Sequence, residues 1–215
     1  MRLNSRVAQA LELNGKVIEE VDSFQYLGSK VTADGGAKED VRSRIGKANA
    51  AFIQLYTIWR NRNISMKTKI RIFNTNVKSV LLYASETWKM DQRSTSQLQV
   101  FVNRCLRRIM RVFWPNTISN EQLWEATGQT KISLEIRRRK WRWLSHTLRK
   151  TDGAIEKKAL EWNPQGTRKR GRSCDTWRRT IMKEASSVGK TWGQLRDLAQ
   201  DRDGWRALLD ALCSR

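Results

Sequence analysis

The spacing of apolar residues predicts a mainly α-helical protein with a small β-hairpin element at its N-terminal end. Short segments of alternating polar and apolar residues flank Asn14-Gly15, a pair that favours a two-residue hairpin turn, and a further strand is expected over residues 23–27. From Lys38 onward, apolar residues recur every three or four positions, which indicates helices with one buried face.

Capping residues and breaks divide the helical part of the chain into segments. The first three expected helices run from Lys38 to about Arg60, from Ser65 through Leu81, and from near Ser94 to before Pro115. A short helix is expected from a capping box at Ser119 and Gln122 to Gly128, and a basic helix from about Ile132 to Lys150. Three short helices are expected around Trp177, after Thr191 and around Trp205. The basic helix begun at Ile132 is expected to bury Leu134, Trp141, Leu144 and Leu148. Residues 162–172 have almost no apolar side chains and are expected to form an exposed basic loop.

The charge of the chain points to a polyanionic partner. The 215 residues include 42 Lys and Arg against 21 Asp and Glu, which gives a net charge of +21. The excess is concentrated in residues 137–183, where sixteen bases face four acids, while the two ends are close to neutral. Nucleic acid is the commonest partner of such a protein.

Arginine predominates in the basic clusters, and its planar guanidinium suits bidentate contacts with phosphate. The candidate nucleic-acid-binding residues are Arg104, Arg107, Arg108 and Arg111 on one helix, Arg137, Arg138, Arg139, Lys140 and Arg142 on the next long one, the loop residues Arg168, Lys169, Arg170 and Arg172, and Arg178 with Arg179. Trp141 and Trp143 point to different faces of their helix, so one is expected in the core and the other is a candidate for stacking on bases.

The residues taken alone predict no catalytic or metal site. The sequence has no Asp-Asp pair, and the acidic residues Asp197, Asp201 and Asp203 are explained by capping and local pairing with arginines. His146 is the only histidine and is expected to be partly buried in a core or interface role. The cysteines Cys105, Cys174 and Cys213 are odd in number and widely spaced.

Several features bear on where the protein works. The longest apolar run is too short for a membrane span, the N-terminal residues lack the apolar core of a signal peptide, and the cysteines suggest a reducing compartment. We therefore expect an intracellular protein, in the nucleus or the cytoplasm, and no membrane partner. The run from Arg168 to Arg172 is also compatible with nuclear import.

The order of several motifs resembles the reverse transcriptases of non-LTR (LINE-type) retrotransposons. The motifs are Asn14-Gly15-Lys16-Val17-Ile18-Glu19, Phe24-Gln25-Tyr26-Leu27-Gly28-Ser29, the segment from Ser79 to Trp88, Arg104-Cys105-Leu106-Arg107, the segment from Trp143 to Arg149, Gly171-Arg172, Thr176-Trp177-Arg178-Arg179, and Asp201-Arg202-Asp203-Gly204-Trp205. The resemblance covers nearly the whole chain and corresponds to the family's C-terminal part, from the primer-grip hairpin through the thumb to the basic C-terminal region.

This resemblance implies three segments and an inactive fragment. Residues 1–36 would correspond to the primer-grip hairpin, with Phe24, Tyr26, Leu27 and Gly28 as primer-grip-like residues, residues 37–115 to a thumb-like helical bundle, and residues 116–215 to the basic C-terminal region. The family's catalytic Asp-Asp motif lies upstream of this part, so we expect no catalytic residue, no metal ligand and no cofactor here. Mg²⁺ is expected only in the complete parent enzyme, an RNA-directed DNA polymerase.

The function implied is binding of RNA or an RNA–DNA duplex, with the missing palm and fingers as a further candidate partner. Two alternatives stay open. The chain is either a transposon relic without activity, or a protein-interaction module that a host has retained and that has no nucleic-acid role.

Overall fold

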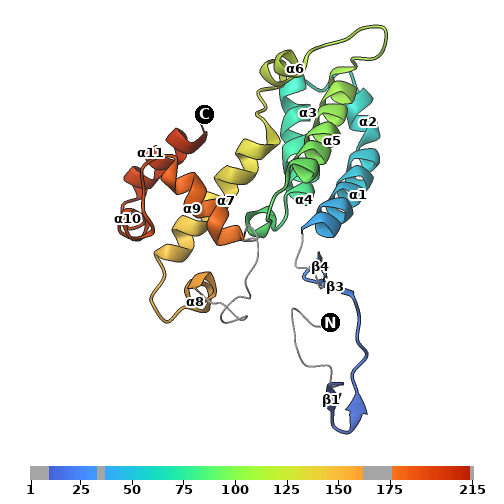
Figure 1. Ribbon diagram of the computed structural model, residues 1–215. Helices are drawn as coiled ribbons and strands as arrows, with labels where there is room; N and C mark the ends of the chain where they lie inside the picture. The colour runs from blue at the N-terminus through green and yellow to red at the C-terminus, as the bar shows by residue number, and fades with distance from the viewer. Residues whose placement is uncertain (1–9, 33–36, 162–175, 214–215) are drawn as a thin grey trace. The chain divides into compact units, whose positions relative to one another are not determined.

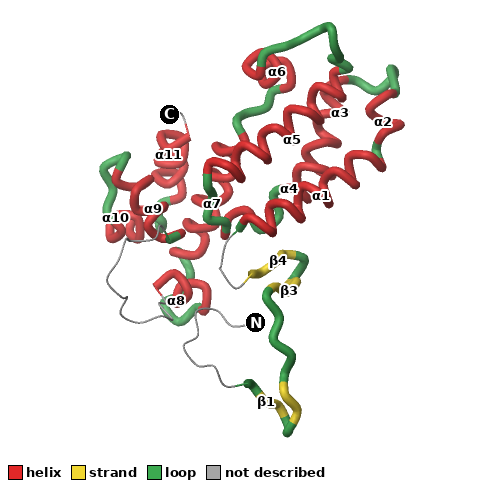
Figure 2. Tube along the Cα trace, turned by 45° about the vertical axis from the view of Figure 1, so that its right-hand side comes forward, coloured by secondary structure: helices red, strands yellow, loops and turns green. Residues whose placement is uncertain are grey.

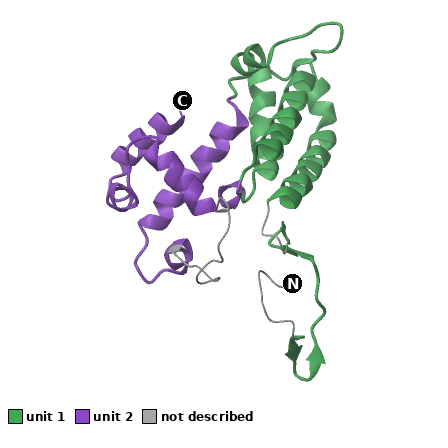
Figure 3. Ribbon diagram, in the orientation of Figure 1, with its two compact units in different colours: residues 1–84, 90–129 green, residues 85–89, 130–215 purple. Residues whose placement is uncertain are grey.

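A computed structural model describes residues 10–32, 37–161 and 176–213, and it confirms the predicted class. Helices predominate, and the described strands are confined to the residues before α1 (Figure 2). The chain divides into two compact units, one of residues 1–84 and 90–129 and the other of residues 85–89 and 130–215 (Figure 3). These two units are compact parts of the fold, whereas the three segments that the resemblance implies are functional parts of the family, so the three segments stay a prediction.

Two antiparallel hairpins precede the helices. β1 (Glu12–Leu13) pairs with β2 (Lys16–Val17) around Asn14 and Gly15, both at positive φ, which confirms the predicted turn. β3 (Ser23–Tyr26) covers the expected strand, but it pairs with a second strand, β4 (Ser29–Thr32), through a tight turn at Leu27 and Gly28. The prediction missed β4 because its short, largely polar sequence has no clear alternation.

The helices of unit 1 form one compact unit (Figure 1), and they bury apolar side chains that include Phe52, Leu98 and Leu106. They are α1 (Lys38–Gln54), α2 (Tyr56–Arg60), α3 (Met66–Ile72), the π-helical turn η1 (Phe73–Lys78), α4 (Ser79–Leu81), α5 (Gln92–Met110) and α6 (Asn120–Thr127). The first helix was predicted to continue to Arg60, but it ends at Leu55, where the backbone leaves helical geometry. Phe52 and Trp59 nevertheless stack across this break, with ring centroids 5.1 Å apart.

Side-chain caps fix the starts of three helices in unit 1, and the sequence predicts the caps at Ser65 and Ser119. The Ser65 side chain accepts from Thr68 N, Asp91 accepts from Ser94 N, and Ser119 forms the predicted capping box with Gln122. The wider π-helical turn η1 keeps the line of apolar residues from α3 into α4 directed at the core, where Phe73, Val77 and Leu81 are fully buried.

Unit 2 contains the short 3-10 turn η2 (Ser85–Thr87) and the helices α7 (Ile132–Leu148), α8 (Ile155–Glu161), α9 (Trp177–Ser186), α10 (Trp192–Leu198) and α11 (Arg202–Cys213). Its core includes Trp141, Leu144, Ile181, Leu195 and Trp205. Leu134 is only half-buried, because Ile132 and Ile136 take the core positions at the start of α7. The sequence pattern did not predict α8. Among the described residues, no helix is long and apolar enough to cross a membrane.

Candidate nucleic-acid interface

The primer-grip-like residues lie on the β3–β4 hairpin and remain exposed. Phe24, Tyr26 and Leu27 are between 43% and 73% exposed, and the rings of Phe24 and Tyr26 are 6.1 Å apart. Their apolar surfaces are therefore available to a partner.

Side chains of α1 hold this hairpin in place. The Lys30 backbone N–H donates to Asp40 Oδ1 at 2.9 Å, Arg44 donates to Ser29 Oγ at 3.0 Å, and Lys47 donates to the carbonyl oxygen of Gly28 at 2.9 Å. The Asp40 and Arg44 side chains are about 95% buried and lie 3.8 Å apart. Because the contacts are charged or partly buried, the exposed turn is fixed relative to α1.

A groove in unit 1 brings together basic side chains from two helices, α1 and α5. It encloses about 870 Å³ and is lined by Arg42, Arg93 and Arg104 together with polar and apolar residues, which are Ile45, Gln92, Ser96, Gln97, Val100 and Phe101. Arg42 also bonds Glu39 at 2.7 Å, a pair exposed enough to exchange for another anion. Arg104 lies over the ring of Phe101, 5.8 Å from its centroid.

Of the three groove arginines, the sequence predicted only Arg104. Arg42 and Arg93 lie outside the dense arginine clusters of the sequence and are about 50 residues apart. Only the packing of α1 against α5 makes them neighbours, so no local pattern signals this surface.

The other predicted arginines of α5 divide between internal and exposed positions. Arg107 donates to the carbonyl oxygen of Ile118 at 3.2 Å and to Asn120 Oδ1 at 2.8 Å, which ties α5 to the segment before α6. Arg108 is exposed, and Arg111 ends the helix in a left-handed conformation with φ 61°. Arg107 is thus engaged within unit 1, whereas Arg104, Arg108 and Arg111 are exposed.

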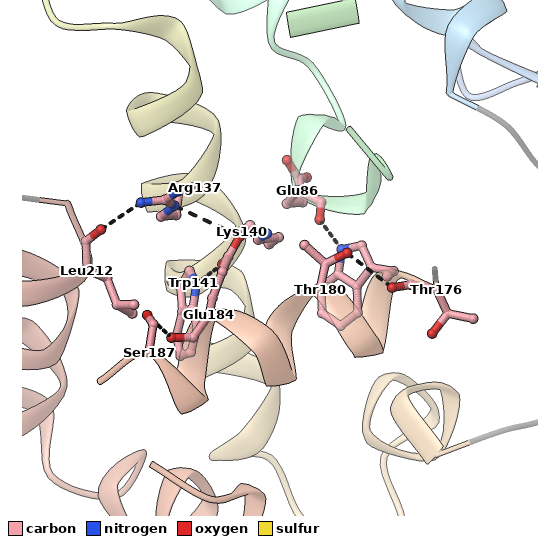
Figure 4. Close-up of polar contacts among 10 residues, drawn as sticks. Glu86, Arg137, Lys140, Trp141, Thr176, Thr180, Glu184, Ser187 and Leu212 are labelled. Carbon is pink, nitrogen blue, oxygen red and sulfur yellow. Dashed lines mark hydrogen bonds and ion pairs between the residues drawn. The ribbon is translucent and has the colours of Figure 1, made fainter. Parts of the chain in front are cut away.

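Two basic side chains of α7, Arg137 and Lys140, contact Glu184 of α9, as Figure 4 shows. Lys140 Nζ lies 2.7 Å from Glu184 Oε1, and the indole N–H of Trp141 donates to Glu184 Oε2 at 2.6 Å. Arg137 reaches the same carboxylate at 3.9 Å and donates to the carbonyl oxygen of Leu212 at 2.8 Å. Lys140 is only 7% exposed.

The remaining predicted side chains of α7 point elsewhere around the helix. Arg139 contacts Glu135 at 3.5 Å on its own helix, Arg138 is half-buried, and Arg142 is exposed. Trp143 packs edge-on against Trp177, with centroids 5.6 Å apart, and Trp141 is fully buried. The core member of the tryptophan pair is therefore Trp141.

On α9, Arg178 lies over the ring of Trp192, 4.8 Å from its centroid, and Arg179 is exposed. Trp177 donates to the carbonyl oxygen of Glu86, which holds the start of α9 within unit 2 (Figure 4). Arg168, Lys169, Arg170 and Arg172 lie outside the described residues, together with Cys174.

The candidate catalytic and metal-binding residues form no metal site in the described part of the structure. There, no three His, Cys, Asp or Glu side chains cluster closely enough to hold a metal ion. His146 is exposed, contrary to the partly buried position expected for it, because it lies about 200° around α7 from the buried Leu144. Burial raises the pKa of the Cys105 thiol to about 12, so it stays protonated and unreactive at neutral pH.

Comparison with known proteins relates the chain to transposon-derived sequence. Residues 51–83 match a family described as a domain of unknown function, DUF6451. Over 203 residues, the chain is 23% identical to a Caenorhabditis elegans protein described as transposon-derived and uncharacterised, and the match covers 89% of this chain and 71% of that protein. No solved structure matches the chain. The similarity supports a relation to transposable elements.

Proposed function

We propose that this chain is a non-catalytic C-terminal part of a LINE-type reverse transcriptase that binds RNA or an RNA–DNA duplex through arginines. Three findings support the proposal. They are the family motifs along the sequence, the transposon-derived relative, and a net charge of +21. The observation that carries it is the unit 1 groove, where Arg42, Arg93 and Arg104 meet on one surface.

The expected mechanism is contact with phosphates and recognition of duplex shape. Guanidinium groups along the groove would neutralise successive phosphates and release their counterions, which gives affinity but little sequence information. The exposed amide and hydroxyl groups of Gln92, Ser96 and Gln97 would add hydrogen bonds to the backbone, including to the 2′-hydroxyls of an RNA strand.

The test is a fluorescence-anisotropy titration of an RNA–DNA hybrid at several salt concentrations. The double variant Arg93→Gln/Arg104→Gln removes two groove charges, and Arg62→Gln/Lys67→Gln removes two exposed charges of the same unit that do not line the groove. We expect the groove variant to reduce the salt dependence of log K by roughly 1 to 2 units, about 0.9 per lost duplex contact, and the control to change it much less. Equal effects of the two variants, or no binding by the wild type at low salt, would refute the proposal.

A further inference from the structure

A second basic surface lies within unit 2, in a cleft between α7 and α11. Four arginines and a single aspartate line a space of about 490 Å³, with Ser145 between them. The arginines are Arg142, Arg149, Arg202 and Arg206, and the aspartate is Asp210. We refer to this feature as the α7–α11 cleft. Its volume falls in the range of sites for nucleotide-sized ligands.

The core of unit 2 builds the floor of the cleft. The indole N–H of Trp205 donates to the carbonyl oxygen of Trp141 at 3.2 Å, and the two rings lie 5.7 Å apart. Trp205 and Leu209 are almost fully buried and line the base of the cleft. The separation of α7 and α11 is therefore fixed by packing and does not depend on a ligand.

Helical spacing directs the arginines into the cleft from both sides. Arg142 of α7 and Arg149, the residue that caps the C-terminal end of α7, are seven residues apart, and Arg202 and Arg206 are four apart on α11, so each pair lies on one side of its helix. Arg149 is held by Ser145 Oγ and by the carbonyl oxygen of Ala199 at 3.2 Å. One guanidinium of the set is thus already positioned.

The charge of the cleft is poorly compensated by the protein itself. Arg206 contacts Asp203 at 2.7 Å, but both side chains are at least 75% exposed, and an exposed pair of this kind contributes little. Within the described part of the chain, no hydrogen bond or ion pair engages the guanidinium of Arg142 or that of Arg202. Four like charges around one small space favour an anion that can accept several donors at once.

The cleft also explains the motif Asp201-Arg202-Asp203-Gly204-Trp205. Asp201 Oδ1 accepts from the Asp203 backbone N–H at 3.0 Å, and the Asp201 carbonyl accepts from Trp205 N, which begins α11. Gly204 leaves room for this turn, because a Cβ there would meet the Leu198 side chain at 2.8 Å. Trp205 then enters the core, while Arg202 faces the cleft.

We propose that the α7–α11 cleft is a phosphate-binding site that holds a phosphate of the bound nucleic-acid strand. This inference rests on the proposed function, and it adds a contact point in unit 2 that is separate from the unit 1 groove. The tetrahedral phosphate accepts hydrogen bonds on several sides, which matches donors arriving from two helices.

The test compares two double variants of the full chain in hybrid binding. Arg142→Gln/Arg202→Gln removes the two cleft arginines that have no hydrogen bond or ion pair to a described residue, and Lys158→Gln/Arg196→Gln removes two exposed charges of unit 2 outside the cleft. Circular dichroism and thermal melting first establish that both variants fold. At 0.1 M salt we expect the cleft variant to bind the hybrid about tenfold more weakly or worse, and the control within roughly threefold of wild type.

A second arm separates the sources of phosphate. Inorganic phosphate and adenosine 5′-monophosphate are titrated while NMR follows the Nε–H signals of the arginine side chains. If the cleft variant binds the hybrid as the control does, the inference is overturned, although wild-type binding would still uphold the proposed function. In another outcome, the wild type does not bind the hybrid but binds the free phosphates, and the cleft variant binds neither. The cleft is then a site for free phosphate, and the assignment to a nucleic-acid strand is overturned.

Discussion

Loss of the Glu184 side chain should destabilise unit 2 strongly, because its carboxylate compensates a buried ammonium. Lys140 Nζ lies 2.7 Å from the carboxylate, and the Lys140 side chain is only 8% exposed. The Glu184→Ala variant leaves this charge without its partner and removes the acceptor of the Trp141 indole N–H.

The size of the effect follows from the burial of the pair. Breaking a buried ion pair by removing one partner costs about 3 to 5 kcal/mol, and the 18% exposure of Glu184 places the value near the lower end, at about 3 kcal/mol. For a unit of this size, each kcal/mol shifts the melting midpoint by roughly 4 to 8 °C, so a loss of about 12 to 24 °C is expected for unit 2.

Near-ultraviolet circular dichroism and tryptophan fluorescence would follow the transition, since Trp141 and Trp205 report on the core of unit 2. Lys140→Met/Glu184→Leu, which replaces both charges by apolar groups, should recover most of the loss. Glu156→Ala is the matched control, because it breaks an exposed contact with Lys150 and should leave the midpoint nearly unchanged. A Glu184→Ala midpoint within about 3 °C of wild type would refute the reasoning that the Lys140 charge is buried and compensated.

Three further outcomes are expected in unit 1 and unit 2. A hydrogen bond from the Ser94 backbone lowers the pKa of Asp91, so its cap stabilises α5 above the ordinary pKa of 3.8 and fades as the pH falls through the lowered value. Asp91→Ala should therefore cost about 1 kcal/mol in urea unfolding at pH 7, and the difference from wild type should shrink in acid. Gly204→Ala should lower the melting midpoint of unit 2, whereas Gly193→Ala, with open space at its Cβ, should not. With the other two cysteines replaced by serine, Cys105 should react with a thiol reagent at pH 8 only as fast as unit 1 unfolds, and rapid labelling of the folded protein would contradict its raised pKa.

Features set by neighbouring residues could be predicted from the sequence. The Asn14-Gly15 turn and the Ser119–Gln122 capping box depend on interactions within four residues, and both occur as expected. The buried lines of α3 to α5 follow from helical periodicity in the same way. The strand β4 was missed because its short, largely polar sequence has no clear alternation, and the break at Leu55 was missed because the apolar spacing continues from Phe52 through Leu55 to Trp59.

The candidate interfaces, in contrast, are formed by residues that are far apart in the sequence. Arg42 and Arg93 come together only because α1 packs on α5, and Glu184 meets Lys140 from 44 residues away. A cluster of bases in the sequence could not distinguish Lys140, which is compensated inside unit 2, from Arg142, which faces a cleft.

The sequence by itself determined the helical class, the caps, the turn of the first hairpin and the excess of positive charge, because each depends on composition or on residues close along the chain. The tertiary structure decided which basic side chains are occupied internally and which converge on a groove or a cleft. Guanidinium and ammonium groups reach several ångströms from their backbone, so their partners depend on the helices packed beside them and not on their sequence neighbours.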